Sequence, residues 1–356
     1  MKTNRYIRQT VLKEFGADAQ HKLSESKVLV VGIGGLGIPV VQYLNAMGVG
    51  TLGLVEHDTI DITNLQRQVL YTEGDVGKSK LKVALSFLKA QNTTTIFKPY
   101  EVALTKENAL DLIAEFDVVV DASDNFATRF LINDACVILK KPFVYGALHA
   151  FEGQVSVFNY KDGPTYRCLF PEMPTPNEIP NCNDNGVLGV IPGIIGNFQA
   201  LEAVKVLTGV GEVLSGKLLL YNGLNQSIVK MSFPVKSENK TIKILRDFYE
   251  WGHCFTTQEI HAGDFQKEIH AGKSFQILDV RTPQEFDTFH LPNSINIPLN
   301  ELERRVNEIN FIEPIYAVCQ SGIRSKAAAG ALQKISERAT IYNVVGGINK
   351  MTVTTA

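Results

Sequence analysis

Residues 27–47 constrain the fold more than any other part of the chain. The apolar run KVLVV predicts a buried strand, the segment GIGGLG predicts a tight turn, and IPVVQYLNAM has the length and apolar content of a packed helix. A strand that turns through glycines directly into a helix is typical of open α/β folds. We therefore expect an α/β protein built on a mostly parallel sheet.

The same alternation of strand and helix continues after residue 47. Residues 1–25 have apolar side chains at helical spacing and predict a helix. Further strands are predicted at residues 51–55, 96–102, 117–121 and 217–221, and helices at 78–90, 106–115 and 192–207. Residues 168–185 contain four prolines and predict a loop. These elements predict one large α/β domain over residues 1–240.

A second, smaller α/β domain is predicted over residues 257–356, after a polar linker at 241–256. Its strands are expected at residues 275–280 and 315–319, and its helices at 283–289 and 325–335. The phrase EIHAG occurs twice, nine residues apart, at residues 259–263 and 268–272. Two such copies do not make a repeat fold.

Composition narrows the class of protein. A formal net charge of −2 over 356 residues gives no electrostatic signature of binding to nucleic acid or anionic membrane. The longest apolar stretch, residues 28–41, is too short to span a bilayer, and the polar first residues lack a signal-peptide core. We expect a cytoplasmic protein. The five cysteines form no C-x-x-C pair, which excludes a disulfide framework and a four-thiolate zinc site.

A nucleotide site is predicted where the glycine-rich turn meets the sheet. The glycines allow a phosphate chain to approach the helix N-terminus, and Glu56 at the end of the next strand suits a ribose hydroxyl pair. These features alone do not distinguish NAD from ATP. A triphosphate also needs cations and a metal-binding carboxylate. Arg67 and Lys80 could neutralise phosphates, and Asp124 could hold Mg²⁺.

The motifs RYIRQ, GIGGLG, TNLQRQ, VGKSK and SDN, in this order, resemble the MoeB/ThiF family and its relatives, the ubiquitin-activating enzymes. The similarity extends through EGQVSVF, YRCLFP and GNFQALEAVKVLTG and covers nearly all of residues 4–230. It implies a Rossmann-like domain that adenylates the C-terminal Gly-Gly carboxylate of a ubiquitin-like sulfur-carrier protein. The residues that it implies at the ATP and Mg²⁺ sites are Gly35, Glu56, Asn64, Arg67, Lys80, Asp124 and Asn125. It also implies a homodimer in which Arg8 reaches the partner subunit's site.

The chemistry of such a reaction agrees with these residues. A C-terminal carboxylate, with a pKa of about 3.5, is already ionised at neutral pH and needs no general base. Positioning and charge neutralisation can therefore supply the catalysis. The only histidine in these motifs, His57, is predicted to lie on the surface.

The cysteines of the first domain are predicted to differ in role. Many relatives carry two C-x-x-C pairs that hold zinc, but here the first pair is reduced to Cys168 and the second is missing, so we expect no zinc. The family often has Asp where Glu56 stands, which retains a carboxylate. Cys182 lies in the proline-rich loop, at a position that resembles the family's acceptor cysteine. Two roles remain open for its thiol, sulfur transfer and ordinary packing. Cys136 is expected in the core, and Cys254 is given no role.

The second domain carries a cysteine loop, CQSGIRS, between a strand and a helix. Backbone N–H groups, the helix N-terminus and Arg324 would favour the thiolate of Cys319. Four residues separate Cys319 from Arg324, whereas tyrosine-phosphatase loops have five, so this loop favours sulfur over phosphate. It resembles the rhodanese family, as do LDVR, HLPNSINIP and GGI, over about residues 259–350. The resemblance implies a persulfide loop with Cys319, Gly322 and Arg324. Asp279 and Arg281 are expected to organise the fold around it.

An adenylated carboxylate and a persulfide on one chain predict conversion of a Gly-Gly carboxylate into a thiocarboxylate. Cys319 and Cys182 are the expected sulfur-transferring thiols. By likeness to fused adenylyltransferase–rhodanese proteins, the expected carrier is the small subunit of molybdopterin synthase. The thiamine-biosynthesis carrier and a tRNA-thiolation carrier are alternatives, and the sulfur donor could be a cysteine desulfurase or thiosulfate. An NAD-dependent oxidoreductase and a non-catalytic scaffold are two further hypotheses. The first is disfavoured by Arg67, Lys80 and Asp124.

Overall fold

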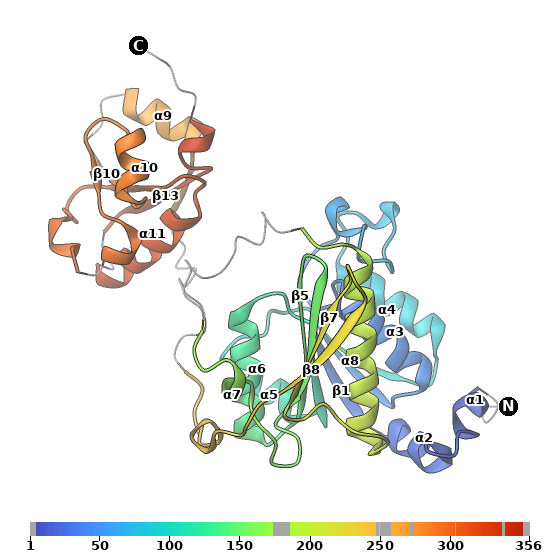
Figure 1. Cartoon of the computed structure of the whole chain (residues 1–356). Coiled ribbons are helices and arrows are strands. Elements are labelled where there is room, and N and C mark those ends of the chain that lie inside the picture. The colour runs from blue at the N-terminus through green and yellow to red at the C-terminus, as the bar shows by residue number, and fades with distance from the viewer. Residues whose placement is uncertain are drawn as a thin grey trace. The chain divides into compact units, whose positions relative to one another are not determined.

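The computed structural model divides the chain into two compact units, Met1–Tyr249 and Glu250–Ala356 (Figure 1). The structure describes residues 5–173, 186–246, 249, 258–270, 274–302, 304–336 and 339–351. Each unit has a sheet and hydrophobic cores of its own. The two units are therefore described separately.

The first unit is built on an eight-stranded sheet in the order β3-β2-β1-β4-β5-β6-β7-β8. The strands are β1 (Lys27–Val31), β2 (Thr51–Val55), β3 (Ile96–Tyr100), β4 (Val118–Asp121), β5 (Phe143–His149), β6 (Glu152–Phe158), β7 (Lys217–Asn222) and β8 (Ser227–Ser232). The five strands from β3 to β5 in this order pair in parallel, and β6, β7 and β8 add antiparallel pairs. The expected α/β fold with a mostly parallel sheet is confirmed.

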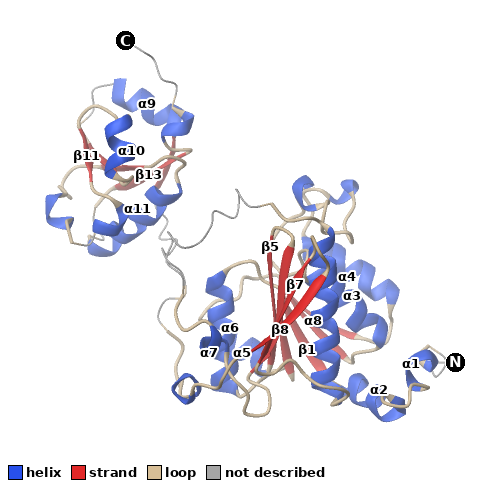
Figure 2. Cartoon of the chain, in the orientation of Figure 1, coloured by secondary structure: helices blue, strands red, loops and turns tan. Residues whose placement is uncertain are grey.

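Helices cover both faces of this sheet (Figure 2). The helices are α1 (Ile7–Thr10), α2 (Gly16–Glu25), α3 (Gly37–Met47), α4 (Lys80–Gln91), α5 (Ala109–Ala114), α6 (Phe126–Leu139), α7 (Tyr166–Leu169) and α8 (Val190–Thr208), and short 3₁₀ turns are η2 (Ile62–Asn64), η3 (Glu73–Asp75) and η4 (Ser237–Lys240). Val28 and Val30 pack into a core with α3, α4 and α8, whereas Leu29 and Val31 pack into a core with α5, α6 and α7. Burial on both faces explains why the strand reads as a continuous apolar run.

The segment 1–25, which was predicted to be helical, is interrupted. The described part of this segment forms α1 and α2, separated by a turn. Gly16 has φ +66, a left-handed value that a continuing α-helix does not allow. Ile7, Val11 and Leu12 remain 46 to 67% exposed, so helical spacing alone did not secure burial.

Helix α8 is the one described helix with the length and apolar composition to cross a membrane. Half of it is buried within the first unit, where it contacts β4, β5, β6, α2 and α3. Its apolar residues therefore serve as core.

The second unit is a five-stranded parallel sheet in the order β11-β10-β12-β13-β9. The strands are β9 (Gln258–His261), β10 (Gln276–Asp279), β11 (Ser294–Asn296), β12 (Ile315–Val318) and β13 (Ile341–Val345). The helices are α9 (Ala262–His270), α10 (Pro283–Thr288) and α11 (Ile323–Ile335), with 3₁₀ turns η5 (Leu299–Glu301), η6 (Val306–Glu308) and η7 (Ile348–Lys350). One core packs against α11 through Leu332, and another packs against α9 through Phe265.

Candidate functional site

The glycine-rich loop lies where the order of strands reverses. From β1 the chain goes to β2 and β3 on one side of the sheet, and β4 on the other side continues to β5. The carboxyl ends of β1 and β4 therefore border the crevice in which open α/β sheets bind ligands. Gly32 has φ +93, and a Cβ there would lie 2.8 Å from the carbonyl oxygen of Ala122 in the loop after β4. The backbone can pass here only because residue 32 has no side chain.

Glu56 supports the glycine-rich loop from the end of β2. Its carboxylate is buried and accepts hydrogen bonds from the backbone N–H groups of Ile33 (2.9 Å), His57 (2.8 Å) and Asp58 (2.9 Å). The hydroxyl of Tyr71 donates to the carbonyl of Ile33 at 2.9 Å, and burial together with the charge of Glu56 raises the pKa of Tyr71. Sequence reasoning assigned Glu56 to a ribose and did not foresee this support of the loop.

Lys80 and Asp58 form an ion pair beside Glu56. The Nζ of Lys80 lies 2.9 Å from Oδ2 of Asp58, and the lysine side chain is buried whereas the aspartate is exposed. The carboxylate and imidazole atoms of Glu56, His57 and Asp58 lie within 4.8 Å of one another. His57 is exposed, as predicted. Asp58 was missed as a partner of Lys80 because the two residues are 22 positions apart.

Arg67 lies next to Gly35 of the glycine-rich loop. A Cβ on Gly35 would lie 3.6 Å from Cδ of Arg67 and 2.9 Å from Cβ of Pro192 in α8. The guanidinium donates to the carbonyl of Thr63 at 3.1 Å. Asn64 closes the 3₁₀ turn η2, where its Oδ1 accepts from the N–H of Asp61 at 3.1 Å. Arg67 therefore lies against Gly35, whereas the side-chain oxygen of Asn64 accepts a hydrogen bond within its own turn.

The loop after β4 presents Asp124 and Asn125, which are both exposed. Oδ1 of Asp121 accepts from the N–H (3.0 Å) and Oγ (2.6 Å) of Ser123, which fixes the start of this loop. Asn125 caps α6 by accepting from the N–H of Thr128 at 2.8 Å. An exposed carboxylate at the switch point suits a hard cation such as Mg²⁺, so Asp124 fits the expected ligand.

A buried polar cluster lies beneath this loop, and sequence reasoning missed it. Arg129 is buried and donates to the carbonyl of Ser123 at 3.3 Å. Desolvation raises the pKa of Asp121, and the nearby charge of Arg129 opposes the shift. The side-chain amide of Gln199 donates to the carbonyl of Asp121 at 2.6 Å. These contacts hold the Asp121–Asp124 backbone from below.

Arg8 is exposed on α1. Its expected contact with a partner subunit stays a prediction. Cys182 and Cys254 lie outside the described residues. Cys136 is fully buried, as predicted, and burial raises the pKa of its thiol. Cys168 is also buried, and its sulfur accepts from the N–H of Lys236 at 3.3 Å.

Cys319 follows β12 at the base of the second unit's loop. It is fully buried, and its Sγ accepts from the N–H of Gly322 at 3.1 Å. Gly322 has φ +94, and a Cβ there would lie 2.9 Å from the backbone nitrogen of Gly346. Oγ of Ser325, in the first turn of α11, lies 3.4 Å from the same sulfur. Of the backbone N–H groups expected around the sulfur, that of Gly322 donates to it within the described residues, and Ser325 is an additional contact.

Arg324, which was expected to add positive potential at the sulfur, has a partner in the described structure. Its guanidinium pairs with both oxygens of Glu285, at 2.7 and 2.6 Å. Hydrogen bonding to Arg324 lowers the pKa of Glu285 to about 2. The positive charge is therefore largely compensated by an acid from α10, a partner that sequence reasoning did not identify.

Asp279 and Arg281 form a buried ion pair beneath the loop, with Nη2 of Arg281 2.7 Å from Oδ2 of Asp279. Arg281 also donates to Oε1 of Gln320 at 3.2 Å and to the carbonyl of Phe289 at 2.6 Å. These bonds link β10, α10 and the cysteine loop, which agrees with the expected organising role.

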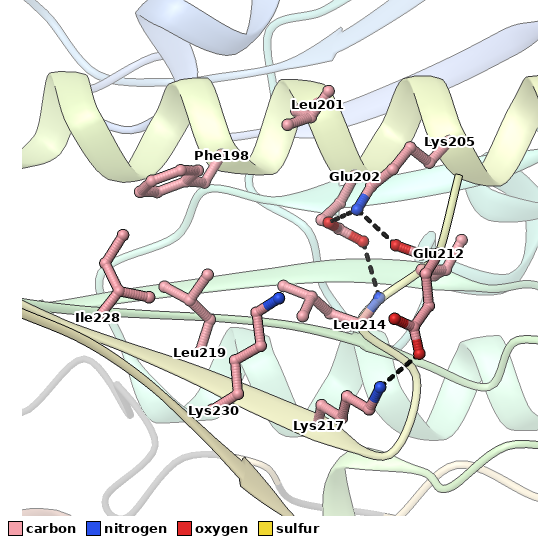
Figure 3. A pocket seen from close by; sticks show the side chains of 11 residues that line it. Phe198, Leu201, Glu202, Lys205, Glu212, Leu214, Lys217, Leu219, Ile228 and Lys230 are labelled. Carbon is pink, nitrogen blue, oxygen red and sulfur yellow. Dashed lines mark hydrogen bonds and ion pairs between the residues drawn. The ribbon is translucent and has the colours of Figure 1, made fainter. Parts of the chain in front are cut away.

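A separate cavity of about 300 Å³ lies between α8 and the β7–β8 hairpin of the first unit. Figure 3 shows apolar side chains along one side of it and charged side chains along the other. Its lining includes Phe198, Leu201, Glu202, Lys205, Leu219 and Ile228. None of the residues predicted for either site lines this cavity, and the lysine Lys205 is already paired with Glu202. The chemistry-bearing residues lie elsewhere.

Comparison with known proteins identifies relatives for both units. The ThiF family model matches residues 6–243, and the model of the rhodanese-like domain matches residues 261–353. A protein of Aedes aegypti named "Adenylyltransferase and sulfurtransferase MOCS3" is 37% identical, over 98% of this chain and 86% of that protein. The protein of the same name from Mus musculus is also 37% identical, over 97% of this chain and 84% of its own length.

Among solved structures, that of E. coli MccB with MccA-N7isoASN matches with a TM-score of 0.60 at 22% identity, covering 68% of this chain and 75% of that one. E. coli MccB with ATP matches with a TM-score of 0.56 at 23% identity, covering 65% and 72%. At this level of identity the likeness concerns the fold alone.

Proposed function

Because the chain belongs to the ThiF family and carries a rhodanese-like domain after it, we propose that it is an enzyme with adenylyltransferase and sulfurtransferase activities. Its substrate is a ubiquitin-like sulfur-carrier protein that ends in Gly-Gly. One observation carries the proposal: a glycine-rich loop at the switch point of one sheet and a cysteine loop at a helix N-terminus of another occur in a single chain. Relatives of nearly full length are named for both activities.

The first unit positions ATP against the carrier. The glycine-rich loop leaves space for the phosphate chain, and Arg67 and Lys80 would neutralise its charge. Lys80 rests on Asp58 in this structure, which keeps the ammonium in the site before the nucleotide arrives. Asp124 would hold Mg²⁺, which supplies further charge neutralisation at the phosphates when bound.

The carrier's terminal carboxylate then attacks the α-phosphorus. A new P–O bond forms, and the bond to the leaving pyrophosphate breaks with its electron pair. The product is an acyl-adenylate. Because the attacking carboxylate is already ionised, the residues have only to hold and neutralise the reactants.

The second unit supplies sulfur. The thiolate of Cys319 takes a sulfur atom from a donor and becomes a persulfide, whose terminal sulfur attacks the acyl carbon of the adenylate and displaces AMP. The resulting acyl disulfide is opened by a second thiol or an external reductant. Attack on the Cys319 sulfur forms a new disulfide and releases the carrier thiocarboxylate. Cys182 is our leading candidate for that thiol, and tethering of the two units raises their effective concentration for each other.

We further propose that the carrier is the small subunit of a molybdopterin synthase, because the relatives carry the name MOCS3. The thiamine-biosynthesis carrier and a tRNA-thiolation carrier remain the alternatives. The assembly is a homodimer, in which the exposed Arg8 extends toward the partner subunit. A cysteine desulfurase or thiosulfate acts as the sulfur donor.

Mass spectrometry of each candidate carrier tests the proposal. After incubation with the enzyme, ATP, Mg²⁺ and a sulfur source, the true carrier gains the mass of an oxygen-to-sulfur exchange. Cys319→Ser abolishes this gain but retains pyrophosphate release, and Lys80→Met abolishes both. If Cys319→Ser forms thiocarboxylate at the wild-type rate, the persulfide route is wrong.

A further inference from the structure

Two polar groups of the described residues lie close to the sulfur of Cys319. One is the backbone N–H of Gly322 at 3.1 Å, and the other is Oγ of Ser325 at 3.4 Å. Cys319 and Ser325 are both fully buried. Because no water reaches a buried hydroxyl freely, its single hydrogen has to be shared between the groups that it touches.

Asn343 is the second group that touches this hydroxyl. Its Oδ1 lies 2.7 Å from Oγ of Ser325, and its side chain is 2% exposed. Asn343 lies on β13 opposite Ala317 of β12, the strand that leads into Cys319. Three neighbouring elements, β12, β13 and α11, thus contribute to one buried row of polar side chains.

Counting hydrogens along this row gives a definite direction to each bond. Oδ1 of an amide can only accept, so at 2.7 Å the hydrogen of Ser325 is donated to Asn343. The serine oxygen then presents only lone pairs to the sulfur. That arrangement suits a neutral S–H, which can donate to it, and disfavours a sulfur anion.

Turning the amide of Asn343 reverses the row. Its NH₂ group then donates to Oγ of Ser325, and the serine hydrogen becomes free to donate to a thiolate or to the anionic sulfur of a persulfide. Asparagine is suited to this role because one end of its amide accepts and the other end donates. Aspartate can only accept, and leucine can do neither.

Resting on the persulfide role proposed above for Cys319, we propose that Asn343 is a positioning residue that acts through Ser325. In the resting arrangement it draws the serine hydrogen away from the sulfur, and on turning its amide it releases that hydrogen to a sulfur anion.

The polar row of Ser325 and Asn343 serves the step in which Cys319 takes up sulfur. When the Cys319 thiolate attacks a persulfide donor R–S–SH, the bond to the terminal sulfur forms, the donor's S–S bond breaks and the electron pair leaves on R–S⁻. When a thiol later opens the acyl disulfide by attack on the Cys319 sulfur, the electron pair leaves on the carrier thiocarboxylate. In the first step the Cys319 sulfur loses its negative charge, and Ser325 changes from donor to acceptor with it. In the second step the Cys319 sulfur stays within a disulfide, and the charge appears on the carrier.

Two ion pairs lie around the cysteine loop. They are Arg324 of α11 with Glu285 of α10, and Arg281 with Asp279 of β10. After β13, the stem of Lys350 packs on Gly346. None of these is exchanged in the variants below, so a change in the pH profile reports on the polar row.

The test is the pH dependence of alkylation of Cys319 by iodoacetamide in the full chain, followed by mass spectrometry of the peptide that contains it. Limited access to the buried sulfur lowers the plateau rate in every variant, so the quantity compared between variants is the midpoint of the profile. Ser325→Ala removes the donor, so the midpoint rises by roughly half to one pH unit. Asn343→Leu removes the competing acceptor, so the midpoint falls by a similar amount.

A double-mutant cycle separates a relay from a loss of packing. In the Ser325→Ala background, Asn343→Leu no longer moves the midpoint. Asn343→Asp keeps the shape of the side chain but can only accept hydrogen bonds, and it raises the midpoint by about one pH unit. The control Asn307→Asp adds the same charge at an exposed position and leaves the midpoint unchanged. Should Asn343→Leu shift the profile equally in both backgrounds, or upward, the relay is wrong. The assay uses neither ATP nor carrier, so it stands or fails independently of thiocarboxylate formation.

Discussion

The loop-supporting role of Glu56 can be tested by Glu56→Gln. In the structure one carboxylate oxygen accepts two backbone N–H groups, and the other accepts the N–H of Ile33 at 2.9 Å. A glutamine can keep its oxygen toward the first two donors, but its NH₂ group then faces the N–H of Ile33. One charge-assisted bond is lost, two are weakened to neutral bonds, and one buried N–H has no acceptor.

The magnitude follows from these counts. A hydrogen bond to a charged group contributes about 1.5–3 kcal/mol, and a neutral one contributes about 1 kcal/mol. The smallest sum of these terms is about 3 kcal/mol, so the substitution should destabilise the first unit by at least that much. For a unit of this size that corresponds to a decrease in Tm of about 6–12 °C.

Differential scanning calorimetry of the nucleotide-free chain measures the decrease. The matched control is Glu101→Gln, which makes the same change at an exposed carboxylate that pairs with Lys82 at 3.1 Å and is hydrogen-bonded to the Ser79 side chain. This substitution should cost less than about 1 kcal/mol. If the two variants have the same Tm, the carboxylate of Glu56 does not hold the glycine-rich loop, and its place beneath the loop needs another explanation.

Three further outcomes follow from the geometry. In the wild-type chain the buried guanidinium of Arg167 lies 2.7 Å from a carboxylate oxygen of Asp134. Asp134→Asn removes this charge partner, so calorimetry should show a loss of about 3–5 kcal/mol in the stability of the first unit. Gly32→Ala places a Cβ 2.8 Å from a carbonyl oxygen at φ +93. The apparent affinity for the nucleotide, measured by thermal shift at increasing ATP concentration, should therefore fall at least tenfold (about 1.4 kcal/mol). The pKa of Glu285 is lowered from 4.5 to about 2, so its pair with Arg324 contributes stability above pH 4.5 and loses it as the pH falls toward 2. Acid titration of unfolding should therefore show the gap between wild type and Glu285→Gln closing over that window, whereas a constant gap would exclude the linkage.

The architecture was largely predictable because its signals are local. A strand buried on both faces reads as an apolar run, as in residues 27–31, and glycines mark the turn that follows. The N-terminal segment was predicted less well. Apolar spacing at Ile7 and Val11 indicated a continuous helix, but spacing does not reveal whether the rest of the chain covers those side chains.

The partners of the site residues could not be predicted, because tertiary packing brings them together. Glu285 lies 39 positions before Arg324 and meets it only because α10 and α11 flank the same loop. Asn343 reaches Ser325 from a neighbouring strand, and no motif marks it. A motif can indicate that an arginine or a cysteine belongs to a site, but the groups that tune its charge become visible only in the fold.

The central claim is that the first unit adenylates a Gly-Gly carboxylate, and ATP–pyrophosphate exchange measures this most directly. With a purified carrier and Mg²⁺, the wild-type chain and Cys319→Ser should exchange labelled pyrophosphate into ATP at similar rates, while Lys80→Met should not. Absence of exchange by the wild-type chain with each Gly-Gly-ending carrier would contradict the account.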